Sequence, residues 1–280
     1  MDPLQFLTTA RVAVVAGKGG VGKTTVTAVL ARAAIRRGLR VLVVELDGKP
    51  SLARLLPDVE VQQLSATAAL AEYLDSHGLS RVTKRLASRG IIDVVATASP
   101  GIDDIVVLGK IKQLERSGLY DLVVVDGPAA GHAITFLLAA KSLLATVRGG
   151  PIASQATEVA AMLADPTRCQ VVLVTLPEAT PVNEAVETAY ALEERVGVHL
   201  GPIVINAVDA GPLLDVDAAP VDSPLRLAAE FRNARRALHH AECRRLGEEL
   251  ALPQLQLPIV AGSQLSAAGV DALADEWAAS

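Results

Sequence analysis

The chain has 280 residues and a formal net charge of −5, and 51% of its residues are hydrophobic. This composition excludes an intrinsically disordered chain, and the acidic balance argues against binding nucleic acid over a whole surface. Only two cysteines occur, Cys169 and Cys243, which excludes a disulfide framework and a cysteine-built zinc or iron–sulfur site within one chain. No apolar run reaches the ~18–20 residues that span a bilayer and no signal peptide is visible, so we expect a cytoplasmic protein.

Short aliphatic runs alternate with longer helical ones along the chain. We predict strands at residues 11–16, 40–45, 122–125, 170–175, 202–206 and 254–260. We predict helices at residues 24–37, 102–117, 134–144, 181–195, 224–250 and 270–278. Uninterrupted aliphatic strands are typical of a parallel sheet covered on both faces. The sequence therefore predicts an α/β fold with a doubly wound, mainly parallel sheet, as a single domain over residues 1–280.

Two segments interrupt this alternation. Residues 47–98 are too many for one crossover and read as mostly helical, so we predict a small helical insert over residues 48–98. Residues 209–223 are rich in Asp, Pro and Ala, which indicates an exposed loop.

The first predicted strand leads directly into a phosphate-binding loop. Residues 17–25 (GKGGVGKTT) satisfy the pattern G-x-x-x-x-G-K-[ST], whose backbone N–H groups and helix N-terminus converge on phosphate oxygens. Lys23 is expected to bridge the β- and γ-phosphates, and the Thr24 hydroxyl to ligate Mg²⁺. The predicted nucleotide contacts are Gly17, Gly19, Gly20, Val21, Gly22, Lys23, Thr24 and Thr25.

Carboxylates follow two of the predicted strands. Asp126 comes directly after residues 122–125, and we predict that it holds Mg²⁺, through water, as the Walker B residue. After the strand at residues 40–45, Asp47 is the candidate for orienting the attacking water, and Glu45 is the alternative. If Asp47 has no catalytic role, it simply starts a turn before Gly48.

The adenine end of the site is predicted from Asn206, which ends the predicted strand at residues 202–206. A side-chain amide carries both a donor and an acceptor, and can therefore pair with the N6 and N7 of adenine. Pro258 and Ile259, near the end of the last predicted strand, are predicted to flank the base.

The second lysine of the loop, Lys18, gives the deviant form that resembles the ParA, MinD, nitrogenase iron-protein and ArsA group of SIMIBI-type P-loop NTPases. In that group the extra lysine reaches the nucleotide of the other subunit. The resemblance therefore implies that Lys18 acts catalytically across a dimer, either a homodimer or a heterodimer with a paralogous subunit.

Residues 126–137 (DGPAAGHAITFL) resemble the switch II segment of the ArsA family, and residues 100–104 (PGIDD) resemble its targeting members. The chain most resembles actinobacterial ArsA-like "anion-transporting ATPase" proteins, relatives of the arsenite-pump and guided-entry (tail-anchored protein targeting) ATPases. The resemblance implies a dimeric Mg-ATP-hydrolysing ATPase that handles a protein client. It also places Gly131 at a hinge and His132 near the phosphate or the interface, although a lone histidine is more often structural.

Departures from these relatives limit what the resemblance implies. Two distant cysteines cannot form the metalloid-binding cysteine cluster of the arsenite pumps, and the CxxC zinc staple of the guided-entry ATPases is absent. Only two methionines are present, Met1 and Met162, so a client groove would be lined by leucines.

Two alternatives remain open. One is a ParA/MinD-like surface-positioning ATPase, although the acidic tail at residues 270–280 lacks the basic face of a membrane helix, so membrane contact would be peripheral at most and DNA is not expected. The arginine-rich helix at residues 224–250 is interpreted as a solvated face with its own glutamates. The other alternative is a nucleotide-binding regulatory subunit with little hydrolysis.

Overall fold

The structure is a computed structural model that describes residues 4–46, 51–76, 101–218, 220, 223–260 and 265–279. Its strands are β1 (Val12–Gly17), β2 (Val41–Glu45), β3 (Glu60–Gln63), β4 (Leu122–Ala129), β5 (Cys169–Thr175), β6 (His199–Leu200), β7 (Ile203–Val208) and β8 (Gln254–Pro258). Its main helices are α2 (Lys23–Arg36), α4 (Ala66–Ser76), α7 (Ile102–Arg116), α8 (Ala130–Thr146), α9 (Pro151–Leu163), α10 (Ala179–Ala191), α11 (Pro224–Glu249) and α12 (Ala267–Ala279). Short helices occur at α1 (Phe6–Thr9) and α3 (Ser51–Leu55), and a π-helical turn (Leu192–Val196) follows α10.

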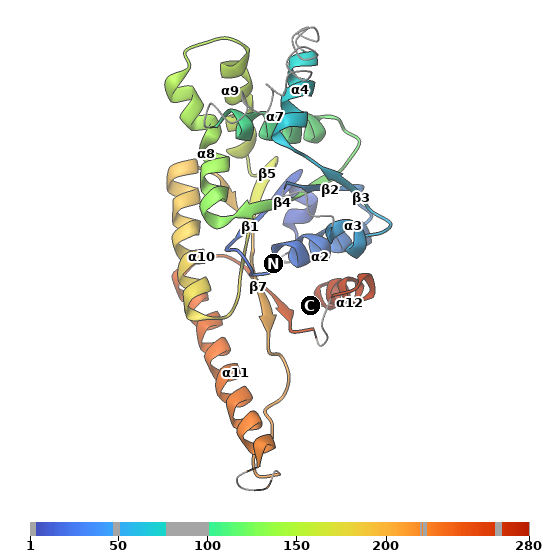
Figure 1. The fold of residues 1–280 in the computed structure, drawn as a ribbon, viewed down its shortest axis with the longest axis vertical. Helices are drawn as coiled ribbons and strands as arrows, with labels where there is room; N and C mark the ends of the chain where they lie inside the picture. Colours follow the sequence, from blue (N-terminus) through green and yellow to red (C-terminus); the bar gives the residue numbers. More distant parts are fainter. Residues whose placement is uncertain are drawn as a thin grey trace.

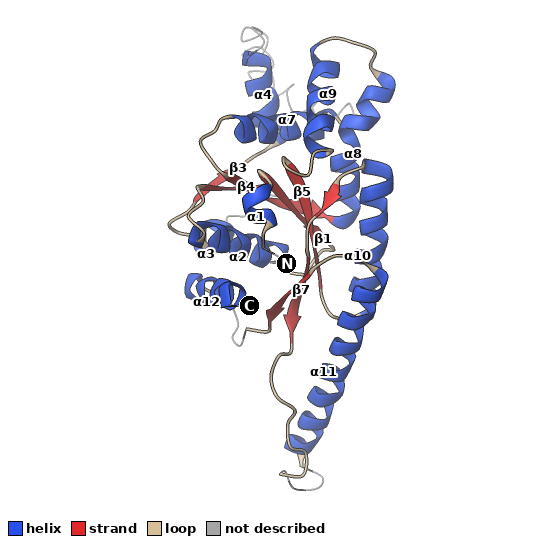
Figure 2. Cartoon of the chain, turned by 180° about the vertical axis from the view of Figure 1, so that it is seen from behind, coloured by secondary structure: helices blue, strands red, loops and turns tan. Residues whose placement is uncertain are grey.

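The strands of the described residues form one eight-stranded sheet in the order β3-β2-β4-β1-β5-β7-β8, with β6 beside β5. Every pairing in it is parallel. Helices α2, α3 and α12 cover one face, and α8, α10 and α11 lie on the other (Figures 1 and 2). This is the doubly wound α/β fold that the sequence predicted.

Alternation along the strands divides the core between the two faces. Val12 and Val14 of β1 pack with α7, α8, α9 and α10, whereas Ala13 and Val15 pack with α2 and α12. Because successive strand residues point to opposite faces, a strand that is apolar at every position must be covered on both. For this reason every residue of β1 and β2 is buried.

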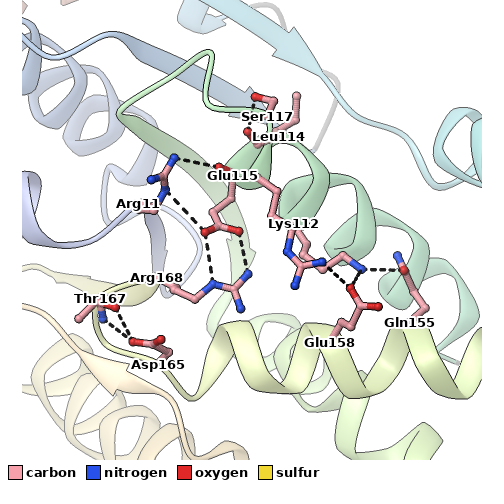
Figure 3. A network of polar contacts seen from close by, with 11 residues as sticks. Arg11, Lys112, Leu114, Glu115, Ser117, Gln155, Glu158, Asp165, Thr167 and Arg168 are labelled. Atoms are coloured by element: carbon pink, nitrogen blue, oxygen red, sulfur yellow. Dashed lines mark hydrogen bonds and ion pairs between the residues drawn. The ribbon is translucent and has the colours of Figure 1, made fainter.

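A buried ion network joins the amino edge of the sheet to helix α7. Glu115 is 6% exposed and accepts hydrogen bonds from Arg168 Nε and Nη2 at 3.2 and 2.7 Å, with Arg11 Nε 3.6 Å away. One turn earlier, Lys112 donates to Gln155 and Glu158 of α9 at 2.9 and 3.0 Å (Figure 3). A buried carboxylate needs such partners because desolvation disfavours an unpaired charge. These contacts fix α7 beside β1, β5 and α9.

The structure differs from the sequence-based expectations in several elements. The segment predicted as a helical insert contributes the edge strand β3 as well as α3 and α4, and its residues 47–50 and 77–98 lie outside the described residues. Strand β4 continues four residues past residue 125, so Asp126 lies within the strand rather than after it. Helix α8 begins at Ala130, which brings Gly131 and His132 into its first turn. Helix α9 and strand β6 were not predicted.

No helix among the described residues is both long enough and apolar enough to cross a membrane.

Candidate nucleotide site

The phosphate loop lies between the end of β1 and the start of α2, at the carboxyl edge of the sheet. Gly22 immediately precedes α2 and has a φ of 91°, a left-handed conformation that favours glycine. A Cβ at Gly22 would collide with the side-chain amide nitrogen of Asn206. The same amide nitrogen donates to the carbonyl oxygen of Val21 at 2.9 Å. The end of β7 therefore holds the loop in shape.

Lys23 and Thr24, two residues predicted to bind the nucleotide, are the first two residues of α2. Lys23 Nζ donates to the carbonyl oxygens of Gly17 and Lys18, each at 3.3 Å, which places its charge at the centre of the loop. Thr24 lies in the first turn of α2, and its hydroxyl donates to Asp126 Oδ2 at 2.8 Å. Gly19 and Gly20 are exposed at the loop tip, Val21 is buried, and Thr25 is half-buried.

Asp126 lies in β4 in register with Val15 of β1 and Glu45 of β2. Its other oxygen, Oδ1, accepts from the Thr27 hydroxyl at 3.3 Å. Burial raises the pKa of Asp126, while the hydrogen bonds from Thr24 and Thr27 and the charge of Lys23 act to lower it. The result is a desolvated carboxylate aimed at the phosphate loop.

The strand can bring Asp126 so close because the next residue is glycine. A Cβ at Gly127 would collide with the carbonyl oxygen of Val15. A register shift between Val15 and Gly17 accompanies this approach.

The side-chain oxygens of Thr24 and Asp126 suit Mg²⁺ only when a nucleotide supplies further ligands. Among the described residues no group of three or more His, Cys, Asp or Glu side chains could hold a metal ion. Thr24 and Asp126 offer hard oxygen atoms, and Mg²⁺ commonly takes one or two protein oxygens along with phosphate oxygens and waters. The two side chains fit that arrangement.

The alternative water-orienting carboxylate, Glu45, is engaged elsewhere. It is 3% exposed, and its oxygens accept from Ser51 Oγ, the Leu52 amide and Gln63 Nε2, each at 3.4 Å. Glu45 thus anchors the start of α3 to the ends of β2 and β3. Asp47, the first choice, lies outside the described residues and stays a prediction.

Lys18 lies at the mouth of the loop and is held by α10 of its own chain. Its Nζ is 2.5 Å from Glu184 Oε1, and the two side chains are 43% and 37% exposed. A cavity of about 440 Å³ lies next to this pair, bounded by Gly19 of the loop, Gly131 and Ile134 of α8, and Glu187 of α10. The lysine that distinguishes the deviant loop is therefore exposed and faces a gap in the molecular surface.

Asn206 reaches the loop because the strand is irregular there. Ala207 has a φ of 58°, which is uncommon outside glycine, and the pairing of β7 with β8 shifts between Ile205 and Val208. One N–H of the Asn206 amide donates to the Val21 carbonyl, and its second N–H and its oxygen, which bond no other described residue, can pair with a base. Pro258 pairs with Val208, and Ile259, 47% exposed, bonds through its amide to the Val208 carbonyl at 3.0 Å. All three residues predicted for the adenine end, Asn206, Pro258 and Ile259, lie at this end of the sheet.

His132 is exposed beside a second cavity of about 390 Å³ that α7, α8 and the ends of β2 and β4 surround. Asp103 and Asp104 of α7 line the same cavity. Burial, and then the charge of Asp103, raises the pKa of Asp104, while His132 acts to lower it. The switch II segment therefore borders the acidic start of α7.

Sequence reasoning missed three of the residues that shape this site. Thr27 could have been found, because it lies one helical turn after Thr24 on the same face of α2. Glu184 belongs to no motif and is 166 positions from Lys18. The role of Ala207 depends on a backbone conformation that its residue type disfavours.

Comparisons with known proteins show which sequences the chain is similar to. Residues 10–148 match the family model described as "Anion-transporting ATPase". The "ATPase BagA" of Mycobacterium tuberculosis is 30% identical over 305 aligned positions, which cover 91% of this chain and 88% of that protein. An "Arsenical pump-driving ATPase" of Escherichia coli is 30% identical over 203 positions, which cover 68% of this chain and 33% of that protein.

The likeness to the mycobacterial ATPase extends over nine-tenths of the chain, and the family match over residues 10–148 includes the phosphate loop and Asp126. The chain therefore belongs to the ArsA-type family of anion-transporting P-loop ATPases, which hydrolyse ATP.

Proposed function

We propose that this ATPase works in the cytoplasm as a dimer with Mg-ATP at the subunit interface, and that hydrolysis changes its shape to handle a protein client. The partner subunit is a second copy or a paralogue. The observation that carries the proposal is Lys18, which extends from the phosphate loop with its side chain 43% exposed and forms an ion pair with Glu184, whose side chain is 37% exposed.

The phosphate-binding residues act together on the nucleotide. Backbone N–H groups of the loop and the N-terminus of α2 hold the phosphates, and Lys23 neutralises charge between them. Thr24 and Asp126 hold Mg²⁺, which when bound offsets the charge that develops on the phosphate oxygens. Asp47 orients the attacking water.

The switch II segment carries the signal away from the phosphates. It joins Asp126 to α8 with no intervening loop, and α8 packs against α7 and α9. A shift of the residues after Asp126 therefore moves α8 as a unit, and interfaces between packed helices change in discrete steps. Helices α4, α7, α8 and α9 lie together (Figure 1), and we propose that this group relays the change to the client.

Other surfaces give less support to the alternatives. Helix α12 buries Val270, Leu273 and Trp277 against α2, so its apolar face is not available for a membrane. Several arginines of α11 are paired with carboxylates: Arg226 with Asp217 and Glu230, Arg232 with Asp209, and Arg245 with Glu242 and Glu249. A metalloid site built from thiolates is also disfavoured, because both cysteines are buried and burial raises the pKa of Cys169 to about 12.

Thr24→Val tests the magnesium role of the threonine hydroxyl. We expect ATP to bind at least about tenfold more weakly in the presence of Mg²⁺, with little change in its absence, because only the metal contact is lost. Calorimetric titrations with and without Mg²⁺ measure this, and Thr24→Ser, which keeps the hydroxyl, is expected to retain the magnesium effect. Equal magnesium dependence in Thr24→Val and the wild type would contradict the assignment.

Lys18→Ala tests action across a dimer. We expect ATP binding to persist and kcat to fall about 100-fold or more, because a cation that stabilises the transition state is removed. Unchanged turnover would show that Lys18 does not act across the interface.

A matched pair of α10 variants tests the ion pair with Lys18. Glu184→Gln is expected to release Lys18, so that half-maximal ATPase activity is reached at a protein concentration up to about fivefold lower, since exposed ion pairs contribute ~0.2–1 kcal/mol. Glu187→Gln removes a neighbouring charge but leaves the pair intact, and should behave like the wild type. Identical concentration curves for both variants would contradict this role of Glu184.

Client handling is tested with Asp47→Asn, which is expected to bind ATP without hydrolysing it and so to trap the complex. Affinity purification with ATP should recover a protein partner that exchange into ADP releases. Lys23→Ala, which is expected not to bind ATP, is the control and should recover none. Recovery of lipid or DNA alone, or of no partner, would overturn the proposal.

A further inference from the structure

Helix α11 forms a stiff arm beyond the sheet. Its amino-terminal half extends past the ends of β7 and β8 (Figures 1 and 2). The preceding loop is fastened to it, because Arg232 binds Asp209 through two hydrogen bonds of 2.9 and 2.8 Å. Asn233 exchanges hydrogen bonds of 3.0 and 2.9 Å with the backbone of Leu214, and Ser223 caps the helix. The side chains of the amino-terminal half of α11 therefore lie on a helix that is braced by the preceding loop.

The arm carries a row of exposed apolar side chains. Leu227, Phe231 and Leu238 are 63%, 70% and 67% exposed, although burial of such apolar side chains stabilises a fold. They lie on a different face from Ala229, His239, Cys243 and Leu246, which are the buried residues of α11. The row is thus not part of the core of its own subunit.

The spacing of the row is that of a two-helix coiled coil. The α11 seam, as we name it, consists of Leu227, Phe231, Ala234, Leu238 and Ala241, and its successive intervals are four, three, four and three residues. Alternation of three and four gives the 3.5-residue repeat that keeps one stripe facing a partner helix. Arg245 ends the seam, since it contacts Glu242, Glu249 and the Ala179 carbonyl. A stripe of this kind fits another helix rather than an extended peptide.

The charges beside the seam favour a second copy in parallel orientation. Glu230 and Arg235 occupy the flanking positions that, in a parallel pair, meet between helices when five residues apart. Two copies would therefore form two identical Glu230–Arg235 pairs, in addition to the 3.3 Å contact of Glu230 with Arg226 within each copy. Arg235 has no carboxylate partner among the residues that the structure describes, and its Nε donates to His239 Nε2 at 3.2 Å. An antiparallel pair stacking the same layers would set Glu230 and Arg235 against alanines.

We propose that the α11 seam is a self-association surface on which a second copy of this chain docks its own α11, parallel and in register. Such a contact is isologous, so the same residues serve both partners. It goes beyond the proposed function, because the seam includes no residue of the nucleotide site and its pairing requires no nucleotide.

Cysteine crosslinking tests the register. In a parallel pair the two Ala234 side chains face one another, so Ala234→Cys should form an intersubunit disulfide under mild oxidation without nucleotide. Ala237→Cys, exposed on the same helix beside the seam, is the control and should crosslink poorly. The two native cysteines are buried and contribute little background. Equal crosslinking of both variants would overturn the proposal.

Charge reversal tests the partner's identity and orientation. We expect sedimentation equilibrium to show a nucleotide-independent dimer, whose dissociation constant rises at least about tenfold in Phe231→Glu. Glu230→Arg should raise it about two- to fivefold, and the double variant Glu230→Arg/Arg235→Glu should restore it. Both exposed charge variants are expected to keep the fold, so they remain informative if Phe231→Glu unfolds.

Two outcomes would overturn the proposal: a wild-type chain that stays monomeric at about 0.1 mM, or a double variant that associates no better than Glu230→Arg. Repeating the measurement with Lys18→Ala separates the two interfaces. If Lys18→Ala loses ATPase activity while the seam dimer stays intact, the result concerns the nucleotide interface alone and leaves the seam proposal standing.

Discussion

The close contact between the phosphate loop and the end of β7 is the constraint on which the site depends. Asn206 donates to the Val21 carbonyl, and the absence of a side chain at Gly22 leaves room for the amide. Lys23 and Thr24 follow directly, so the geometry of that contact determines where the lysine charge and the hydroxyl lie. Because β1, β4 and β7 are all in one parallel sheet, their carboxyl ends reach the loop from both sides. A rigid sheet thus preorganises a phosphate cradle before any ligand arrives.

Helix α7 links that cradle to the opposite edge of the sheet. At its end, Glu115 is fixed by Arg11 and Arg168, and at its start Asp103 and Asp104 face the switch II histidine across a cavity. A helix anchored at one end by a buried ion network is a stable reference against which α8 can move. The network is also costly to break, since a buried carboxylate left without its partner destabilises proteins by about 3–5 kcal/mol.

The sequence predicts those parts of the molecule that repeat a simple pattern. The central strands and the helices between them follow from buried aliphatic runs, and GKGGVGKTT is specific enough to predict a nucleotide loop. Strand β3 was missed because its sequence, EVQQ, lies at the sheet edge and lacks an apolar pattern. The extension of β4 depends on Gly127 fitting against the Val15 carbonyl, and the aim of Asn206 depends on the left-handed Ala207. Contacts such as Lys18–Glu184 join distant segments, which no local motif records.

A calorimetric titration of Gly22→Ala with Mg-ATP tests most directly whether the strand ends hold the phosphate loop in one conformation. The added methyl group must displace Asn206, and the alanine must adopt the positive φ of Gly22. We therefore expect no calorimetric binding at concentrations that saturate the wild type. The circular dichroism of the variant should be unchanged. Gly149→Ala, where a Cβ meets open space, is the control and should bind normally. Binding by Gly22→Ala within about twofold of the wild type would show that the strand ends do not hold the loop in its binding conformation.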